Sequence, residues 1–198
     1  MDELKETLHR IEYQIEDASE YFHFNEAATV NEILDLEAEC GFVLPKSYRI
    51  FLNYFNGGFI SAFPVPAKLS FESARWNSNV LLGTNEIRAE YEKLSARRWK
   101  ISAKNDNTYP FIPFCWTSEN ELLIFVSSPN DKNESHVFDA FHEEWPASWG
   151  CLYPSFIHLL NDYLVSNGGI SKISNKPPFA EEYLNQVLLN NSENICAI

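Results

Sequence analysis

Cysteine is scarce in this sequence, and the four that it has, Cys40, Cys115, Cys151 and Cys196, lie far apart. No two of them form a C-x-x-C pair, and no histidine stands at metal-ligand spacing from any of them. We therefore expect neither a disulfide framework nor a zinc site.

Long apolar runs are missing as well. No stretch approaches the roughly 18 consecutive apolar residues that a membrane-spanning helix requires. The chain starts with Met1-Asp-Glu-Leu-Lys-Glu, which is acidic and lacks the apolar core of a secretory signal. These two absences lead us to expect a cytoplasmic protein that has no membrane partner.

The sequence also lacks the motifs of common enzyme classes. It contains no G-x-S-x-G nucleophile turn and no G-x-x-x-x-G-K-[ST] or G-x-G-x-x-G phosphate loop. None of its five histidines stands in a catalytic spacing. On an extended strand His136 and His142 would lie about 20 Å apart at ~3.3 Å per residue, too far to share a metal ion unless the chain turns between them. We expect no catalytic residues, no metal and no cofactor.

Basic residues are few: 15 Lys and Arg stand against 28 Asp and Glu, a formal charge of −13. This balance disfavours binding to nucleic acid, which relies on cationic side chains at the phosphates. It favours a basic protein partner, whose capture long-range attraction would accelerate. Solubility alone is the other explanation for an acidic surface.

The charge is unevenly placed along the chain. Residues 1–39 hold twelve acids against two bases, a net charge of −10, and residues 119–144 hold seven acids against one base, a net charge of −6. Residues 68–104 hold eight bases against four acids, a net charge of +4. Contact of this basic segment with an acidic one would neutralise part of the charge within the molecule.

Two tryptophans follow the second acidic segment, in Trp145-Pro-Ala-Ser-Trp149. Aromatic anchors inside a charged rim are typical of protein interfaces, so we hypothesise a partner-binding surface here. Its residues would be Glu119, Glu121, Asp131, Glu134, Glu143, Glu144, Trp145 and Trp149. A packing role, with Trp145 covering a sheet edge, is the alternative. The acidic N-terminal helix is a rival surface.

The first half of the chain reads as helical. Apolar spacing predicts an amphipathic helix at residues 2–18, then a connector at residues 21–24. Two short helices, at about 30–40 and 45–55, should meet at a corner. Thr29 and Glu32 form a capping box at the start of the first, Gly41 ends it in a left-handed conformation, and Pro45 suits the first turn of the second.

The second of these helices should bury Tyr48, Phe51, Leu52 and Phe55, and we expect Gly57 or Gly58 to have a positive φ where the chain turns. A strand at residues 59–63 and a helix at residues 85–94 follow. Polar turns then separate three strand candidates at residues 111–116, 121–126 and 136–141, which predicts an antiparallel meander. Pro113 indicates an edge or irregular position for the first of them.

A further helix is expected at residues 156–164. After a polar linker at residues 170–178, a last short helix should occupy residues 180–189. The fold class is therefore α+β, with a mostly antiparallel or mixed sheet of about five or six strands and helices packed on it. We expect one domain over residues 1–170, and a linker, a short helix and a frayed tail over residues 171–198.

The helical corner resembles the signature of the SUKH superfamily, the Smi/Knr-type domain. The matching positions are Glu37, Gly41, Phe42, Leu44, Pro45, Tyr48, Phe51, Leu52, Asn56, Gly57 and Gly58. A looser resemblance extends through the strands and the helix near residue 160, so that it covers residues 30–165. The turn at residues 117–121 departs from the pattern, because it lacks the glycine that family members have there.

The resemblance implies function as well as fold. Bacterial members of the family act as immunity proteins that bind and neutralise toxins, often nucleases, and such a toxin would be a basic protein. Fungal members resemble scaffolds in cell-wall signalling. The resemblance thus implies a non-catalytic binding protein that neutralises a toxin, with a regulatory scaffold that has no toxin partner as the alternative.

Overall fold

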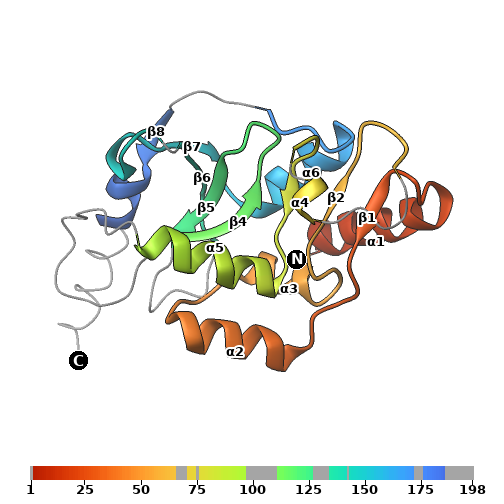
Figure 1. The fold of residues 1–198 in the computed structure, drawn as a ribbon, viewed down its shortest axis with the longest axis horizontal. Coiled ribbons are helices and arrows are strands. Elements are labelled where there is room, and N and C mark those ends of the chain that lie inside the picture. The colour runs from red at the N-terminus through yellow and green to blue at the C-terminus, as the bar shows by residue number, and fades with distance from the viewer. Residues whose placement is uncertain are drawn as a thin grey trace.

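The computed structural model describes residues 2–65, 71–74, 76–96, 111–126, 134–141, 143–171 and 176–185. One antiparallel sheet forms the middle layer, and its eight described strands follow one another in the order of the sequence (Figure 1). The strands are β1 (Phe22–Phe24), β2 (Gly58–Ile60), β3 (Val80–Leu81), β4 (Phe111–Trp116), β5 (Leu122–Val126), β6 (Val137–Ala140), β7 (Gly150–Tyr153) and β8 (Lys176–Phe179).

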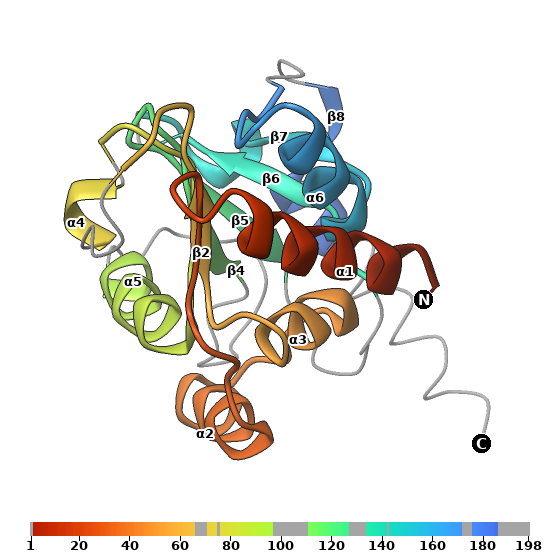
Figure 2. The ribbon, with the colours of Figure 1, turned by 90° about the vertical axis from the view of Figure 1, so that its right-hand side faces the viewer.

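Helices cover both faces of this sheet. Figure 2 shows α1 (Asp2–Asp17), α3 (Lys46–Leu52) and α6 (Phe156–Val165) on one side of the strands, with α4 (Phe71–Ala74) and α5 (Thr84–Ala96) on the other. The helix α2 (Val30–Cys40) packs beside α5, and the short 3₁₀ helix η1 (Pro146–Ser148) precedes β7. The expected α+β class is confirmed, and the sheet is larger than the five or six strands expected.

The central strands are apolar on both sides because both of their faces are buried. In β5, Leu123 and Phe125 belong to the larger core under α1, α3 and α6, whereas Leu122, Ile124 and Val126 belong to a second cluster on the other face. An alternating pattern arises only where one face meets water, so a continuous apolar run is the pattern that such a strand requires.

Most predicted helices are confirmed. The N-terminal helix, the two corner helices, the helix after residue 84 and the helix after residue 155 all form, with bounds that differ by a few residues. Residues 180–185 are helical too, and Ala180 and Leu184 are buried in the second cluster. The predicted helix at residues 180–189 is thus confirmed over the part that the structure describes.

Four short strands were not predicted: β1 in the expected connector, β3, β7, and β8 in the expected linker. The linker expectation is wrong for residues 176–178, because β8 pairs with β7 and extends the sheet. Its residues Pro177 and Pro178 lack N–H donors and are tolerated because β7 is the one described strand that pairs with β8. The edge position expected from Pro113 is also wrong, since β4 lies between β3 and β5, but the expected irregularity is present as a register shift between Pro113 and Cys115.

The turn without the family's glycine keeps the conformation that glycine would supply. Asn120 has φ 64°, in the left-handed region that asparagine tolerates better than most residues. Its amide donates to the Thr117 carbonyl at 2.9 Å, and the Thr117 amide donates to the Glu121 carbonyl at 2.8 Å. The hairpin between β4 and β5 therefore closes normally.

Replacing Phe51 tests the larger core. Its side chain is fully buried among the rings of Tyr48, Phe55 and Phe156. We predict that Phe51→Ala lowers the free energy of unfolding by about 3–5 kcal/mol, measured by urea denaturation, because a cavity remains where the ring was. Leu34→Ala, at an exposed position of α2, is the control and should change stability little.

The second cluster makes stability depend on pH through His136. The centre of its half-buried ring lies 4.6 Å from that of Tyr183, and its Nδ1 has no hydrogen-bond partner among the described residues. Burial lowers its pKa from 6.5, so the unfolded chain binds this proton more readily than the folded protein does. We predict that stability falls as the pH drops below 6.5 towards the lowered pKa, and that His136→Phe removes this part of the loss. An equal loss in both proteins, in urea titrations at several pH values, would contradict the assignment.

Candidate protein-interaction surface and the family corner

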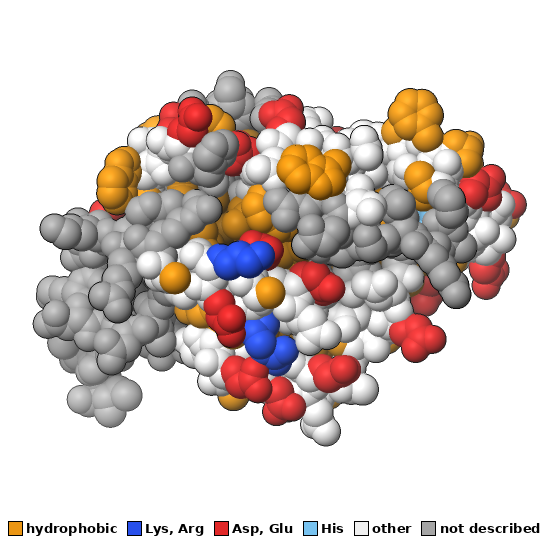
Figure 3. Space-filling view, viewed as in Figure 1, with side chains coloured by type: hydrophobic (Ala, Val, Ile, Leu, Met, Phe, Trp, Pro, Cys, Tyr) orange, Lys and Arg blue, Asp and Glu red, His pale blue; other side chains and the backbone are white. Residues whose placement is uncertain are grey.

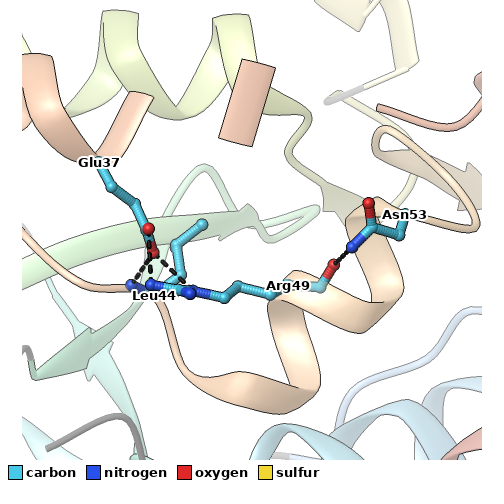
Figure 4. A network of polar contacts seen from close by, with 4 residues as sticks. All are labelled: Glu37, Leu44, Arg49 and Asn53. Carbon is cyan, nitrogen blue, oxygen red and sulfur yellow. Dashed lines mark hydrogen bonds and ion pairs between the residues drawn. The ribbon is translucent and has the colours of Figure 1, made fainter. Parts of the chain in front are cut away.

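The carboxylate of Glu37 holds the corner between α2 and α3. Gly41, with φ 72°, ends α2, and its amide donates to the Glu37 carbonyl at 2.9 Å. The Glu37 side chain then reaches past the end of its helix. Its Oε1 accepts from the Leu44 amide at 2.7 Å and from Arg49 Nε at 2.7 Å, and its Oε2 accepts from an Arg49 guanidinium nitrogen at 2.6 Å (Figure 4).

This arrangement satisfies a buried charge completely. Only 8% of Glu37 is exposed, and a buried carboxylate is stable only when it is paired and hydrogen-bonded. A bidentate contact with a guanidinium fixes direction as well as distance. Figure 4 shows Arg49 lying along α3 towards Glu37, while its carbonyl accepts from the Asn53 side chain at 2.9 Å. The corner is therefore set by polar contacts as well as by packing.

Tyr48 joins the corner to the sheet. Its ring packs against the rings of Phe51, Phe114, Phe125 and Phe156 in the buried core. Its hydroxyl group lies 2.7 Å from the Leu82 carbonyl and 3.0 Å from the Phe114 carbonyl, which also accepts from the Leu82 amide at 2.8 Å, so the hydroxyl group donates to backbone carbonyls at the junction of β3 and β4. Burial raises the pKa of Tyr48 well above 10.0, and the side chain stays a donor at physiological pH.

Asn56, Gly57 and Gly58 form the junction with α5. The Asn56 side chain accepts from the Thr84 amide at 2.8 Å, at the start of α5. Gly57 has φ 80°, and a Cβ atom there would lie 2.4 Å from the Gly83 amide nitrogen. The positive φ predicted for Gly57 or Gly58 is confirmed at both residues. The signature residues thus have structural roles that position β2, β3 and α5.

The residues proposed for partner binding do not form one surface. Leu122 of β5 pairs with Ala140 of β6, so the turn at residues 117–121 and the loop at residues 141–149 lie at the same end of the meander. Glu134 precedes β6 and lies at the opposite end, roughly five residues or about 16 Å away along the strands. Asp131 lies outside the described residues.

Three of the proposed residues have internal roles. Glu121 is buried. The carboxylate of Glu134 accepts hydrogen bonds from the amide and the hydroxyl group of Ser47, and Glu134 thereby caps the start of α3. Trp149 has no exposed surface, and its indole N–H donates to the Phe141 carbonyl at 3.1 Å. The expectation that Trp149 contacts a partner is therefore wrong, because its ring fills the second cluster.

Trp145 has the opposite environment. It is 62% exposed, so the alternative in which it covers the sheet edge is wrong. Glu143 beside it is exposed, Glu144 is half-buried, and Glu119 is exposed on the neighbouring turn. We call Glu119, Glu143, Glu144 and Trp145 the Trp145 surface.

The rival surface on the N-terminal helix α1 is acidic as well, and exposed acidic residues also occur on α2. Figure 3 shows acidic side chains over α2 and α5 with few basic ones between them. Arg88 of α5 lies 2.6 Å from Glu39 of α2, and Lys93 lies 2.7 Å from Glu90. A basic segment thus does contact an acidic one. These pairs use basic charge from residues 68–104 and leave the exposed acids of α1 and α2 in excess.

The described residues offer no site for metal chemistry. No group of three or more His, Cys, Asp or Glu side chains among them is placed to hold a metal ion. Within the same part of the chain, no helix combines the length and the apolar character needed to cross a bilayer. The hydroxyl group of Ser155 and Nδ1 of His158 lie 2.8 Å apart at the start of α6, and Ser155 makes no side-chain hydrogen bond to the backbone of that helix.

Replacing Glu37 tests the corner. We predict that Glu37→Ala lowers the free energy of unfolding by roughly 3 kcal/mol, because it leaves Arg49 and the Leu44 amide without their acceptor. Asp35→Ala, on the exposed side of the same helix, removes the same charge and should cost little. Equal effects of the two substitutions in urea denaturation would show that only the net charge matters.

A comparison with family models places the chain among known proteins. The model of the SMI1/KNR4 family (SUKH-1) matches residues 27–162, which is more than half of the 198 residues. The match begins after α1 and ends within α6, and it includes the corner, the junction at Asn56 and strands β2 to β7. A search of curated proteins found no match. The chain belongs to the SMI1/KNR4 (SUKH-1) family.

Proposed function

We propose that this protein is a non-catalytic binding domain of the immunity type, which neutralises a basic toxin, such as a nuclease, by direct contact in the cytoplasm. Family membership carries the proposal, because the SUKH resemblance implies this role for bacterial members. The charge of −13 supports a basic partner. A nuclease matches this charge, since its substrate-binding surface must be positive to hold phosphates.

The Trp145 surface is the part of the molecule that we propose as the contact. An exposed tryptophan beside carboxylates supplies a large apolar anchor with a charged rim. Trp149 supports this role indirectly, because its buried ring and its hydrogen bond to Phe141 fix the loop that carries Trp145. The short helix η1 between the two tryptophans restricts the loop further. A loop fixed before binding loses less conformational freedom when the partner arrives.

The function is tested by sequencing the genes beside this one and coexpressing any toxin domain found there with this protein. We expect coexpression of the present chain to protect cells from the toxin, and the purified proteins to form a complex in which the toxin is inactive. A chain that binds no such protein and protects no cell would contradict the proposal and would favour the regulatory scaffold.

The two parts of the Trp145 surface should affect different rate constants. We predict that Trp145→Ala increases the dissociation rate of the complex about tenfold or more and leaves association nearly unchanged, because an anchor acts in the bound state. Trp76→Ala is the matched control, since Trp76 is 63% exposed and distant in sequence. Equal dissociation rates for the two variants, in surface-binding kinetics, would exclude Trp145 as an anchor.

Neutralising the rim should slow the encounter instead. We predict that Glu143→Gln with Glu144→Gln lowers the association rate and flattens its dependence on salt. Glu6→Gln with Glu16→Gln, at exposed positions of α1, removes the same charge from the rival surface. If the α1 pair lowers the association rate more in stopped-flow measurements, the contact lies on that helix. If neither pair changes the association rate, the acidic charge serves solubility alone.

A further inference from the structure

The strand β1 leaves one edge of the sheet open. It is first in the strand order, and β2 is its only neighbour among the described strands. The Ser61 amide donates to the Tyr21 carbonyl at 2.8 Å, and the Asn25 amide donates to the Gly57 carbonyl at 3.0 Å. In an antiparallel pair the direction of the backbone groups alternates, so residues 21, 23 and 25 face β2 and residues 22 and 24 face outwards.

The open stretch has a defined length. The Val65 amide donates to the Glu20 carbonyl at 3.0 Å, so the chain after β2 occupies the edge before Phe22. The amide and carbonyl groups of Phe22 and Phe24 remain directed away from β2. The side chains of Phe22 and Phe24 cannot recognise the side chains of a partner, because both rings pack towards the larger core. The edge therefore offers four backbone groups to an extended chain.

A pocket of about 240 Å³ lies next to this edge, on the face of the sheet that carries the side chains of His23, Phe59 and Val80. His23, Phe59 and Val80 stand in one row across β1, β2 and β3 and form its floor. The ring of His23 is stacked on the ring of Phe59, with their centres 4.8 Å apart. Nε2 of His23 lies 3.0 Å from the Glu20 carbonyl, which fixes the imidazole ring in this position.

The far wall of the pocket is acidic. It is formed by Gly83 and Glu86 at the start of α5, and none of the described residues that line the pocket is a Lys or an Arg. No hydrogen bond or ion pair joins Glu86 to another described residue, and its side chain is partly exposed. Glu20 and Glu26, at the two ends of β1, are exposed as well. An aromatic floor with a carboxylate wall suits a cationic side chain.

Edge and pocket are matched in register. A residue added opposite His23 on the open side would direct its side chain to the same face as His23, because directly opposed residues of an antiparallel pair share a face. That face carries the pocket. The pocket volume of about 240 Å³ leaves room for one long side chain.

We propose that β1 pairs with an extended segment of a basic protein and that this segment places an Arg or Lys side chain in the pocket against Glu86. Backbone bonds to Phe22 and Phe24 supply the register, and the pocket selects the cation. This inference deepens the proposed function, on which it rests, by naming a second contact and the conformation of the partner there.

The probe is a nine-residue peptide of alternating threonine and valine with a single arginine at its centre. Three readouts are expected: amide exchange of Phe22 and Phe24 slows at least tenfold in the complex, Glu86→Gln raises the peptide's Kd about tenfold, and N-methylation of the two amides that flank the arginine abolishes binding. Glu92→Gln, at an exposed position of the same helix, removes the same charge and should leave Kd unchanged. A peptide with glutamate at the centre should not bind.

Each opposite result overturns the inference. A peptide that does not bind at millimolar concentration, that binds Glu86→Gln and Glu92→Gln equally, or that leaves the amides of Phe22 and Phe24 unprotected excludes the edge as a docking site. These outcomes are separate from the toxin experiment. A toxin complex that depends on Trp145 but leaves both amides unprotected supports the proposed function and excludes the edge as a docking site. Peptide binding at the edge without protection of cells supports the docking site and contradicts the proposed function.

Discussion

The carboxylate of Glu37 is buried between two helices, and it accepts hydrogen bonds from the Leu44 amide and from two nitrogens of Arg49. Because removal of any partner would leave a charge unpaired away from water, the angle between α2 and α3 is closely restricted. That angle places Tyr48 so that its ring enters the aromatic core and its hydroxyl group reaches carbonyls near β3 and in β4. The arrangement of the first half of the chain on the sheet follows from this corner.

Acidic residues serve two purposes in this protein, and their hydrogen-bond partners distinguish them. Glu37 and Glu134 bind backbone and side-chain donors of the chain itself, the buried Glu37 at the corner and the exposed Glu134 as a cap on α3 supplied from 87 residues away. Glu39 is paired with Arg88 across two helices. The acids that remain at the surface belong to α1, α2 and α5, to the C-terminal helical segment, to the Trp145 surface and to the surroundings of β1. Only these can contribute to the attraction of a basic partner.

The two tryptophans of the 145–149 segment show how one sequence motif divides into different roles. The loop turns through η1 between them, so Trp149 is directed into the second cluster and Trp145 into solvent. The buried ring holds the loop, and the exposed ring is presented by it. The hypothesis placed both rings in one interface, but burial against β4 and the C-terminal helical segment removes Trp149 and leaves Trp145 available for a contact.

Local interactions were readable from the sequence by itself. The capping box at Thr29, the left-handed Gly41, the helical apolar spacing and the long apolar strand β5 each depend on neighbours within a few residues, and all were predicted. The class of the fold and its family followed from them. The features that only the tertiary structure decided depend on contacts with residues distant in sequence. The strands β1, β3, β7 and β8 have two to four residues, too few for a period to be recognised, and they exist because an adjacent strand supplies their hydrogen bonds. The exposure of Trp145, the capping role of Glu134 and the open edge at β1 depend in the same way on contacts across the sheet, which no local pattern encodes.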